Sequence, residues 1–261
     1  MTPTHAAQQA ALDLLDQERY REAEAALAAL PASPVVLWKR GAALHGLNRF
    51  PESVAALEAA RAGFADPLER ARCDLEIALA CVKWTRIPEA EAALAACKPV
   101  FEAAGAADEL ARWALLDLAR IQRAGGYAAF AEGYGPMVER LLELGDARWA
   151  AYALAQAALG HRMRNEYAAC EAAARRGLAL ADPLGLVYRQ AHLRYSLAVC
   201  AHDRNDWKAM AEWLDGARER VAISGGALLE ADIALLDASY RYAQGDLDGF
   251  VRLNRRVLDL Y

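Results

Sequence analysis

The apolar residues of this chain fall into short segments with helical spacing, and the segments come in pairs. In each pair an alanine-rich segment is followed by a brief turn and then by a large apolar residue that opens a second segment. These seven opening residues, called anchors below, are Tyr20, Phe50, Ile87, Tyr127, Tyr167, Trp207 and Leu247. Successive anchors lie 30, 37, 40, 40, 40 and 40 residues apart, and four equal intervals indicate an internal repeat. Such a period is typical of a helical solenoid, whose units are stable only when stacked.

Two further sets of positions keep a fixed offset from the anchors. Two residues before them stand Glu18, Asn48, Thr85, Gly125, Asn165, Asn205 and Gly245. Five of these seven are Gly or Asn, which tolerate the left-handed backbone that ends a helix. Three residues after the anchors stand Ala23, Ser53, Ala90, Phe130, Cys170, Met210 and Phe250. Because this is one helical turn further on, we expect the second set to face the partner helix.

The repeat predicts seven helix pairs: near 3–16 and 20–30, 34–46 and 50–63, 67–83 and 87–104, 107–124 and 127–144, 146–162 and 166–181, 183–203 and 207–222, and 226–243 and 247–260. Pro34, Pro67 and Pro183 lie near the starts of first helices, where a missing N–H costs nothing. Pro136 instead lies inside a predicted helix, where proline costs about 3 kcal/mol. We expect the helix to break or kink there, either as a tolerated irregularity or as a hinge that changes the curvature.

The segments Tyr20-Arg-Glu-Ala23, Phe50-Pro-Glu-Ser53 and Ile87-Pro-Glu-Ala90 resemble the junction between the two helices of a tetratricopeptide repeat. The family has a small residue eight or nine positions before the anchor, and Ala11, Gly41, Ala78, Ala158, Ala198 and Ala238 fit, whereas the fourth repeat has Leu118. The resemblance implies an all-α fold, a right-handed α-solenoid of about seven antiparallel helix pairs that forms a single domain over residues 1–261. The 40-residue spacing is longer than the family's usual repeat of about 34 residues and is similar to the enlarged repeats of bacterial regulators.

Composition limits the classes of function. The net charge of −5 argues against nucleic-acid binding, and no segment approaches the roughly 18 apolar residues of a membrane span. Five scattered cysteines without a CxxC pair favour a reduced, cytoplasmic setting. Alanine is abundant and the basic residues are mostly Arg, which is typical of a high-GC bacterial genome. The chain has no phosphate-binding, dinucleotide, zinc-protease or serine-elbow motif, so we expect no enzyme activity and no cofactor.

One set of residues has the atom types of a metal site. His192, Cys200 and His202 lie on one predicted helix and could offer nitrogen and sulfur ligands. Their spacing, however, winds across different faces of that helix. The sequence therefore predicts no bound metal ion.

The resemblance also implies where a ligand would bind, because first helices line the concave face in this family. The residues projected onto that groove are Trp38, His45, Arg72, Lys83, Arg112, Gln122, Arg123, Tyr152, Arg162, His192, Tyr195 and His202. In the third to fifth repeats this stripe is basic and contains no acid. Arg offers a bidentate fork to carboxylates, and aromatic rings offer rigid contact surface. We therefore expect an acidic peptide or a protein in a basic groove flanked by aromatic residues, although solvated polar residues on an exposed face would give the same pattern.

Three functions remain open at this stage. The first is a non-enzymatic scaffold or receptor that binds a protein or peptide. The second is an all-α enzyme with its active site in the groove, and the third is a self-assembly module of a larger bacterial regulator. The last predicted helix is rich in apolar residues, and no further segment follows to cover it. We therefore predict a homodimer in which the last helices of two copies meet, through Phe250, Leu253, Val257 and Leu260.

Overall fold

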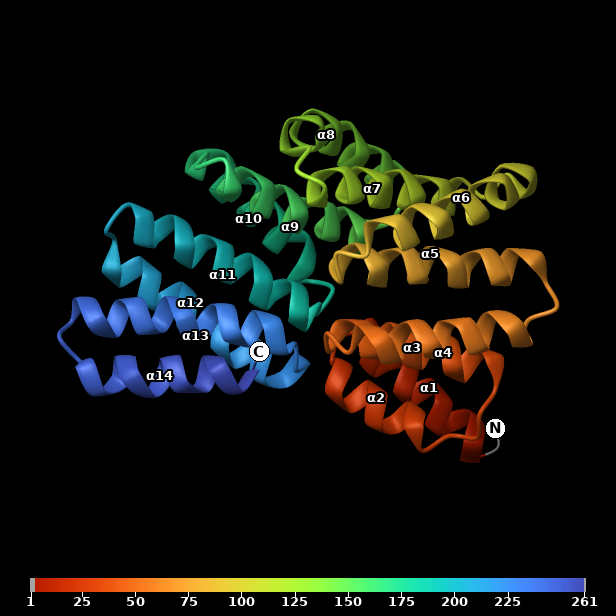
Figure 1. The fold of residues 1–261 in the computed structure, drawn as a ribbon, viewed down its shortest axis with the longest axis horizontal. Helices are drawn as coiled ribbons and strands as arrows, with labels where there is room; N and C mark the ends of the chain where they lie inside the picture. Colours follow the sequence, from red (N-terminus) through yellow and green to blue (C-terminus); the bar gives the residue numbers. More distant parts are fainter. Residues whose placement is uncertain (1–2, 261) are drawn as a thin grey trace.

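The chain folds into a continuous array of helices (Figure 1). A computed structural model describes residues 3–260, and within that range every regular element is an α-helix. The helices are α1 (Pro3–Asp16), α2 (Tyr20–Ala28), α3 (Pro34–Gly46), α4 (Phe50–Gly63), α5 (Pro67–Lys83), α6 (Ile87–Ala104), α7 (Ala107–Arg123), α8 (Tyr127–Glu143), α9 (Ala147–Met163), α10 (Tyr167–Ala181), α11 (Val187–Asp203), α12 (Trp207–Ser224), α13 (Ala227–Ala243) and α14 (Leu247–Leu260). They form seven consecutive hairpins, and this confirms the predicted all-α solenoid.

The turns inside the hairpins follow the repeat closely. The residue two places before each anchor has a positive φ in all seven hairpins, from 56° at Glu18 to 97° at Gly125. At the second turn the Asn48 and Arg49 amides donate to the carbonyls of His45 and Leu44, both at 3.0 Å, which closes the end of α3. The prediction of left-handed turns is therefore confirmed, even at Glu18 and Thr85, which are neither Gly nor Asn.

The small positions of the repeat are places of close helix contact. A Cβ on Gly41 would lie 2.6 Å from Leu57, so no larger residue fits there without movement. In the fourth hairpin, where Leu118 replaces the small residue, a Cβ on Gly133 of α8 would lie 2.9 Å from the Leu118 side chain. The glycine on α8 therefore makes room for the leucine on α7.

One expected helix break is absent, and one predicted helix start is wrong. Helix α8 runs without a break through Pro136, and α6 likewise contains Pro99. Both prolines are exposed, so water can bond the carbonyl that loses its N–H partner one turn earlier. In the sixth repeat α11 begins at Val187 rather than near Pro183, which lies in the preceding turn.

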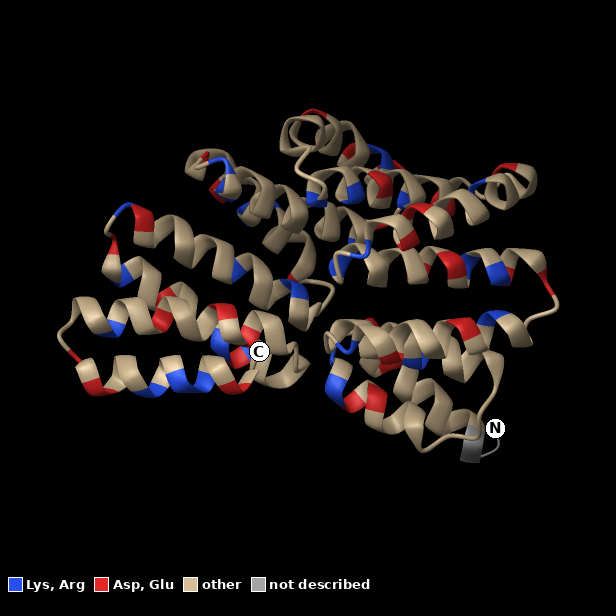
Figure 2. Ribbon diagram, in the orientation of Figure 1, with Lys and Arg blue, Asp and Glu red and all other residues tan. Residues whose placement is uncertain are grey.

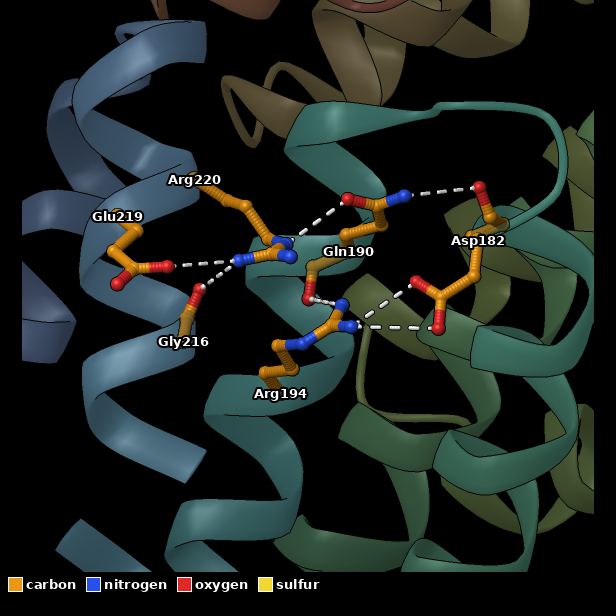
Figure 3. A network of polar contacts seen from close by, with 7 residues as sticks. Asp182, Gln190, Arg194, Gly216, Glu219 and Arg220 are labelled. Atoms are coloured by element: carbon orange, nitrogen blue, oxygen red, sulfur yellow. Dashed lines mark hydrogen bonds and ion pairs between the residues drawn. The ribbon is translucent and has the colours of Figure 1, made fainter. Parts of the chain in front are cut away.

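Polar contacts fix α11 against both of its neighbours (Figure 3). Arg194 of α11 binds Asp182 at the end of α10, with N–O distances of 3.1 and 3.3 Å. Gln190 donates to the Ala181 carbonyl at 3.2 Å and accepts from Nε of Arg220 on α12 at 3.0 Å. The helix that carries much of the inner surface is thus held from two sides.

The two ends of the chain's array meet. In Figure 1 the first four helices lie beside α11–α14, although the two groups are far apart in sequence. Tyr188 of α11 packs against Tyr20 of α2 with ring centroids 5.7 Å apart, and it joins the apolar cluster of α1–α3. Arg148 of α9 donates to Asp16 and to the Leu15 carbonyl, both at 3.0 Å. We call these contacts, with those of the next paragraph, the closing junction.

The closing junction also satisfies the starts of two helices that lack a capping side chain of their own. The Val187 amide donates to the Gln17 carbonyl at 3.0 Å, and the Arg189 amide donates to Oε2 of Glu18 at 2.7 Å. The Leu228 amide in the first turn of α13 donates to Oδ1 of Asn48 at 3.1 Å. The first four N–H groups of a helix have no partner within it. The N-terminal turns therefore act as remote caps, and they bind the two ends of the solenoid together.

The homodimer predicted through α14 stays a prediction, and the structure shows how its four residues lie within one chain. Val257 is buried within the chain, Phe250 packs against Tyr242 of α13 at 5.4 Å, and Leu253 lines a hollow with Ile233 of α13. Leu260 is half-buried. Val257 is thus covered within the chain, whereas Phe250, Leu253 and Leu260 keep part of their surface exposed. The exposed part of α14 carries Arg and Asp residues together with Leu247, Val251 and Leu258. Figure 2 shows that charges of both signs are interspersed over the helices.

Membrane insertion can be assessed for the described residues. None of their helices combines the length and the apolar character that crossing a bilayer requires.

Candidate functional site

The predicted groove residues lie on the first helices of repeats two to six, as expected. They come from α3, α5, α7, α9 and α11, and the structure divides them into two groups. One group lines a chamber of about 510 Å³ on the side of the closing junction. The other comprises Lys83, Gln122, Arg123 and Arg162 near the C-terminal ends of α5, α7 and α9, and His192, Tyr195 and His202 on α11.

Five predicted residues line the chamber: Trp38, His45, Arg72, Arg112 and Tyr152. Acidic side chains also line it, namely Asp16, Glu18, Glu76, Asp108, Glu109 and Asp146. Further basic residues there are Lys39, Arg148 and Arg189. The chamber therefore has charges of both signs, and the predicted absence of acids is wrong.

The chamber arginines are already paired within the chain. Arg72 Nε donates to Glu109 at 2.8 Å, and its Nη1 donates to Glu69 at 2.8 Å. Arg112 binds Asp146 at 2.6–2.7 Å, and the same aspartate caps the start of α9. Each arginine thus meets the N-terminal end of the next first helix, where acids are favoured by the cap and the helix dipole. The groove prediction missed these acids because they lie 34 or 37 residues further along the chain.

The second group of cations has no such partners. Lys83, Arg123 and Arg162 make no ion pair with a carboxylate among the residues that the structure describes. The Lys83 ammonium lies 5.5 Å from the centre of the Tyr152 ring. Arg162 lies 5.5 Å from the Tyr195 ring centre and donates to its hydroxyl at 3.5 Å. Burial lowers the pKa of Lys83 well below its usual value, and the charges of Arg123 and Arg189 lower it further.

Two histidines lie within the field of these cations. Burial lowers the pKa of His45 to about 3, and the charges of Lys83 and Arg189 contribute. Burial also lowers the pKa of His192 well below its usual value, with Lys83 the largest charge contribution. Both imidazoles are therefore neutral near pH 7, and each retains one donor and one acceptor nitrogen.

Polar atoms without a hydrogen-bond partner occur on the same first helices. Among the described residues, the buried side-chain nitrogen and oxygen atoms without a hydrogen-bond partner are His45 Nε2, Gln122 Oε1, Tyr152 Oη, Gln156 Nε2, Arg189 Nε and His192 Nδ1. All six belong to α3, α7, α9 or α11. Buried polar groups are hydrogen-bonded in the great majority of cases. These six atoms are therefore candidates for hydrogen bonds to a ligand.

His202 lies apart from this surface. Its ring packs against Trp207 at 5.4 Å, at the junction of α11 and α12, so it helps to close that hairpin. No three His, Cys, Asp or Glu side chains within the described range are grouped so that they could hold a metal ion.

Sequence reasoning missed Arg189, Gln156 and Glu18. Arg189 lies in the first turn of α11, which the sequence placed four residues too early. Its guanidinium lies 4.8 Å from the Tyr152 ring centre and also binds Glu18 at 3.2 Å. The one signal that could have found this contact is an acidic residue at a turn position occupied elsewhere mostly by Gly or Asn.

Comparison with known proteins gives similarity at the level of structure. No protein-family model matches the chain, and no curated protein matches its sequence. A Rap protein complexed with Competence and Sporulation Factor matches with a TM-score of 0.65 and 12% identity, over 92% of this chain and 78% of that one. The Rap conjugation gene regulator of the plasmid pLS20, in complex with the Phr peptide, matches with a TM-score of 0.60 and 15% identity, over 92% and 67%.

A third similar structure names the repeat. It is a signal transduction ATPase from Pyrococcus horikoshii with a tetratricopeptide repeat sensor, with a TM-score of 0.57 and 12% identity over 92% of this chain and 44% of that one. At this level of identity the likeness shows the fold alone. It confirms the resemblance drawn from the sequence: the chain has an α-solenoid fold of the tetratricopeptide-repeat type.

Proposed function

We propose that this protein is a non-enzymatic receptor or scaffold that binds an acidic peptide, or an acidic segment of a protein, on the inner face of the solenoid. The observation that carries the proposal is the set of polar and charged groups on that face. It combines a chamber of about 510 Å³ with unpaired cations and polar atoms that lack partners. This volume lies in the range of sites that enclose small ligands or short chain segments.

The similar structures support a peptide as the ligand. One of them is a complex with Competence and Sporulation Factor, and another is a complex with the Phr peptide. Aromatic residues along the chamber, such as Trp38, Trp149 and Tyr152, offer rigid contact area at low entropic cost. The paired arginines on the chamber wall favour a ligand of mixed polarity there, and the unpaired cations favour acidic groups beyond it.

Selection from a displayed library of random peptides tests the proposal. We expect the wild-type protein to enrich peptides rich in Asp and Glu. Ala42→Phe adds bulk to the chamber lining and should weaken their binding about tenfold or more, whereas Ala95→Phe on the exposed side of α6 should leave it unchanged. The proposal is overturned if no peptide is enriched over the empty support, or if the selected peptides bind both variants equally well.

A further inference from the structure

The second group of cations and the unsatisfied atoms form one cluster. Lys83 and Arg189 both lie close to the ring of Tyr152, at 5.5 and 4.8 Å from its centre. Gln122 precedes Arg123 on α7 and donates to the Gln156 carbonyl of α9 at 3.2 Å, which brings its amide against that helix. Helices α5, α7, α9 and α11 thus direct polar groups to one part of the inner face.

The members of this cluster are buried enough for their missing bonds to cost free energy. Gln122, Tyr152, Gln156 and Arg189 are each more than nine-tenths buried, and each has an atom without a partner. Three of those atoms are donors: the Tyr152 hydroxyl, the Gln156 amide nitrogen and Nε of Arg189. A buried donor without an acceptor is destabilising, and cations held together without an anion add repulsion.

An oxyanion would satisfy both needs at once. Its oxygens accept several hydrogen bonds, and its charge offsets the excess positive charge of the lysine and arginines. No carboxylate of the described residues forms an ion pair with Lys83, Arg123 or Arg162. The cluster differs in this respect from the chamber arginines Arg72 and Arg112, which the chain neutralises itself.

We propose that Lys83, Arg123 and Arg162, with the donors of Tyr152, Gln156 and Arg189, form a binding site for an oxyanion, either a carboxylate or a phosphate group. The site specifies which group of the ligand is recognised, and its place in peptide binding rests on the proposed function. Arg162 and Tyr195 form its edge on α9 and α11. Lys83 supplies the positive charge from α5, at 5.5 Å from the centre of the Tyr152 ring.

Thermal unfolding at constant ionic strength tests the site with two probes, inorganic phosphate and the dipeptide acetyl-Asp-Glu. Either oxyanion, replacing chloride, should raise the Tm of the wild type by about 2–4 °C or more. Lys83→Met should abolish the rise and should itself raise the Tm in chloride, because it removes a half-buried cation that forms no ion pair among the described residues. Lys98→Met is the matched control, since Lys98 also lies over an aromatic ring, that of Trp113 at 4.4 Å, but on α6. It should respond as the wild type does.

A second variant distinguishes loss of binding from loss of folding. Arg123 is exposed, so Arg123→Gln should fold normally and still lose most of the response to both probes. A response to phosphate alone identifies a phosphate site, and a response to the dipeptide alone identifies a carboxylate site; both support the proposal. Equal responses of wild type, Lys83→Met and Arg123→Gln overturn it, as does the absence of any response in the wild type.

The two proposals can fail separately. If selected peptides bind the inner face and the variants respond to oxyanions as the wild type does, the oxyanion site is refuted and the peptide receptor stands. If oxyanions depend on Lys83 but no peptide is enriched, the peptide receptor is refuted and the oxyanion site stands.

Discussion

Removal of the Glu18 carboxylate should open the closing junction. Glu18 is only 1% exposed, and it accepts bonds from the Arg189 amide at 2.7 Å and from Nη2 of Arg189 at 3.2 Å. Its backbone has a φ of 56°, a conformation that costs a non-glycine residue free energy. The chain therefore tolerates local strain to bring this carboxylate to the start of α11, where the helix dipole also favours a negative charge.

The expected loss in free energy of unfolding follows from the groups that Glu18→Ala leaves without a partner. The buried Arg189 guanidinium loses its only carboxylate partner in the described structure, and its Nε has no partner to begin with. Breaking one side of a buried ion pair costs about 3–5 kcal/mol. Asp16→Ala is the matched control: Asp16 pairs with Arg148 at 3.0 Å, but it is 74% exposed, so its loss should cost about 0–1 kcal/mol.

Urea denaturation measures the loss in free energy of unfolding, and hydrogen exchange measures whether the closing junction opens. The Val187 and Leu228 amides donate across the closing junction, so both should lose protection in Glu18→Ala while amides in the interior of α5 keep theirs. Unfolding free energies that differ by less than 1 kcal/mol between Glu18→Ala and the wild type, with both amides still protected, would refute the view that Glu18 holds the junction closed.

Three other predictions concern packing and protonation. Gly46→Ala should cost about 1–3 kcal/mol in denaturation experiments, because the added Cβ would lie 2.2 Å from the aromatic ring that opens α2; unchanged stability would contradict this contact. Because the folded-state pKa values of His45 and His192 lie below the unfolded value near 6.5, the stability that their neutral forms contribute is complete above pH 6.5 and is lost as the pH falls, toward about 3 for His45. His45 should lower the free energy of unfolding by about 2 kcal/mol at pH 5, and His45→Gln should show a weaker pH dependence than the wild type. Val257→Ala should cost about 1–2 kcal/mol, whereas Leu258→Ala, at a site that is 77% exposed, should stay within about 0.5 kcal/mol; equal costs would reverse the faces assigned to α14.

The features that could be predicted from the sequence are those that depend on residues close together in the chain. The anchors and the turn positions before them fix where each hairpin turns, and every one of those turns has the left-handed backbone. The fourth repeat has Leu118 in place of the expected small residue, and Gly133 on the paired helix leaves room for this leucine. The helix continues through Pro136, as in the reading of a tolerated irregularity, and the exposure that lowers the cost of an interior proline is not contained in a helix pattern.

Contacts between residues of different repeats could not be predicted from the repeat pattern. The partners of Arg72 and Arg112 lie one repeat further on, and those of Arg189 lie at the other end of the array. A period shows that repeats stack, but it does not give the curvature that decides which repeats meet after several have stacked. Five of the predicted groove residues therefore share a chamber with acidic side chains that the sequence pattern did not indicate.

The closing junction and the proposed oxyanion site share Arg189, and this makes their energetics interdependent. One edge of its guanidinium binds Glu18, while Nε remains without a partner beside Tyr152. An oxyanion bound through Nε would therefore bind best when Glu18 already orients the guanidinium. A ligand that prefers the closed arrangement must stabilise it by the same factor by which closure raises the ligand's affinity. We expect Glu18→Ala to weaken the phosphate response while Asp16→Ala preserves it, as measured by calorimetric titration with phosphate. Equal phosphate affinities in all three proteins would show that the junction and the inner face act independently.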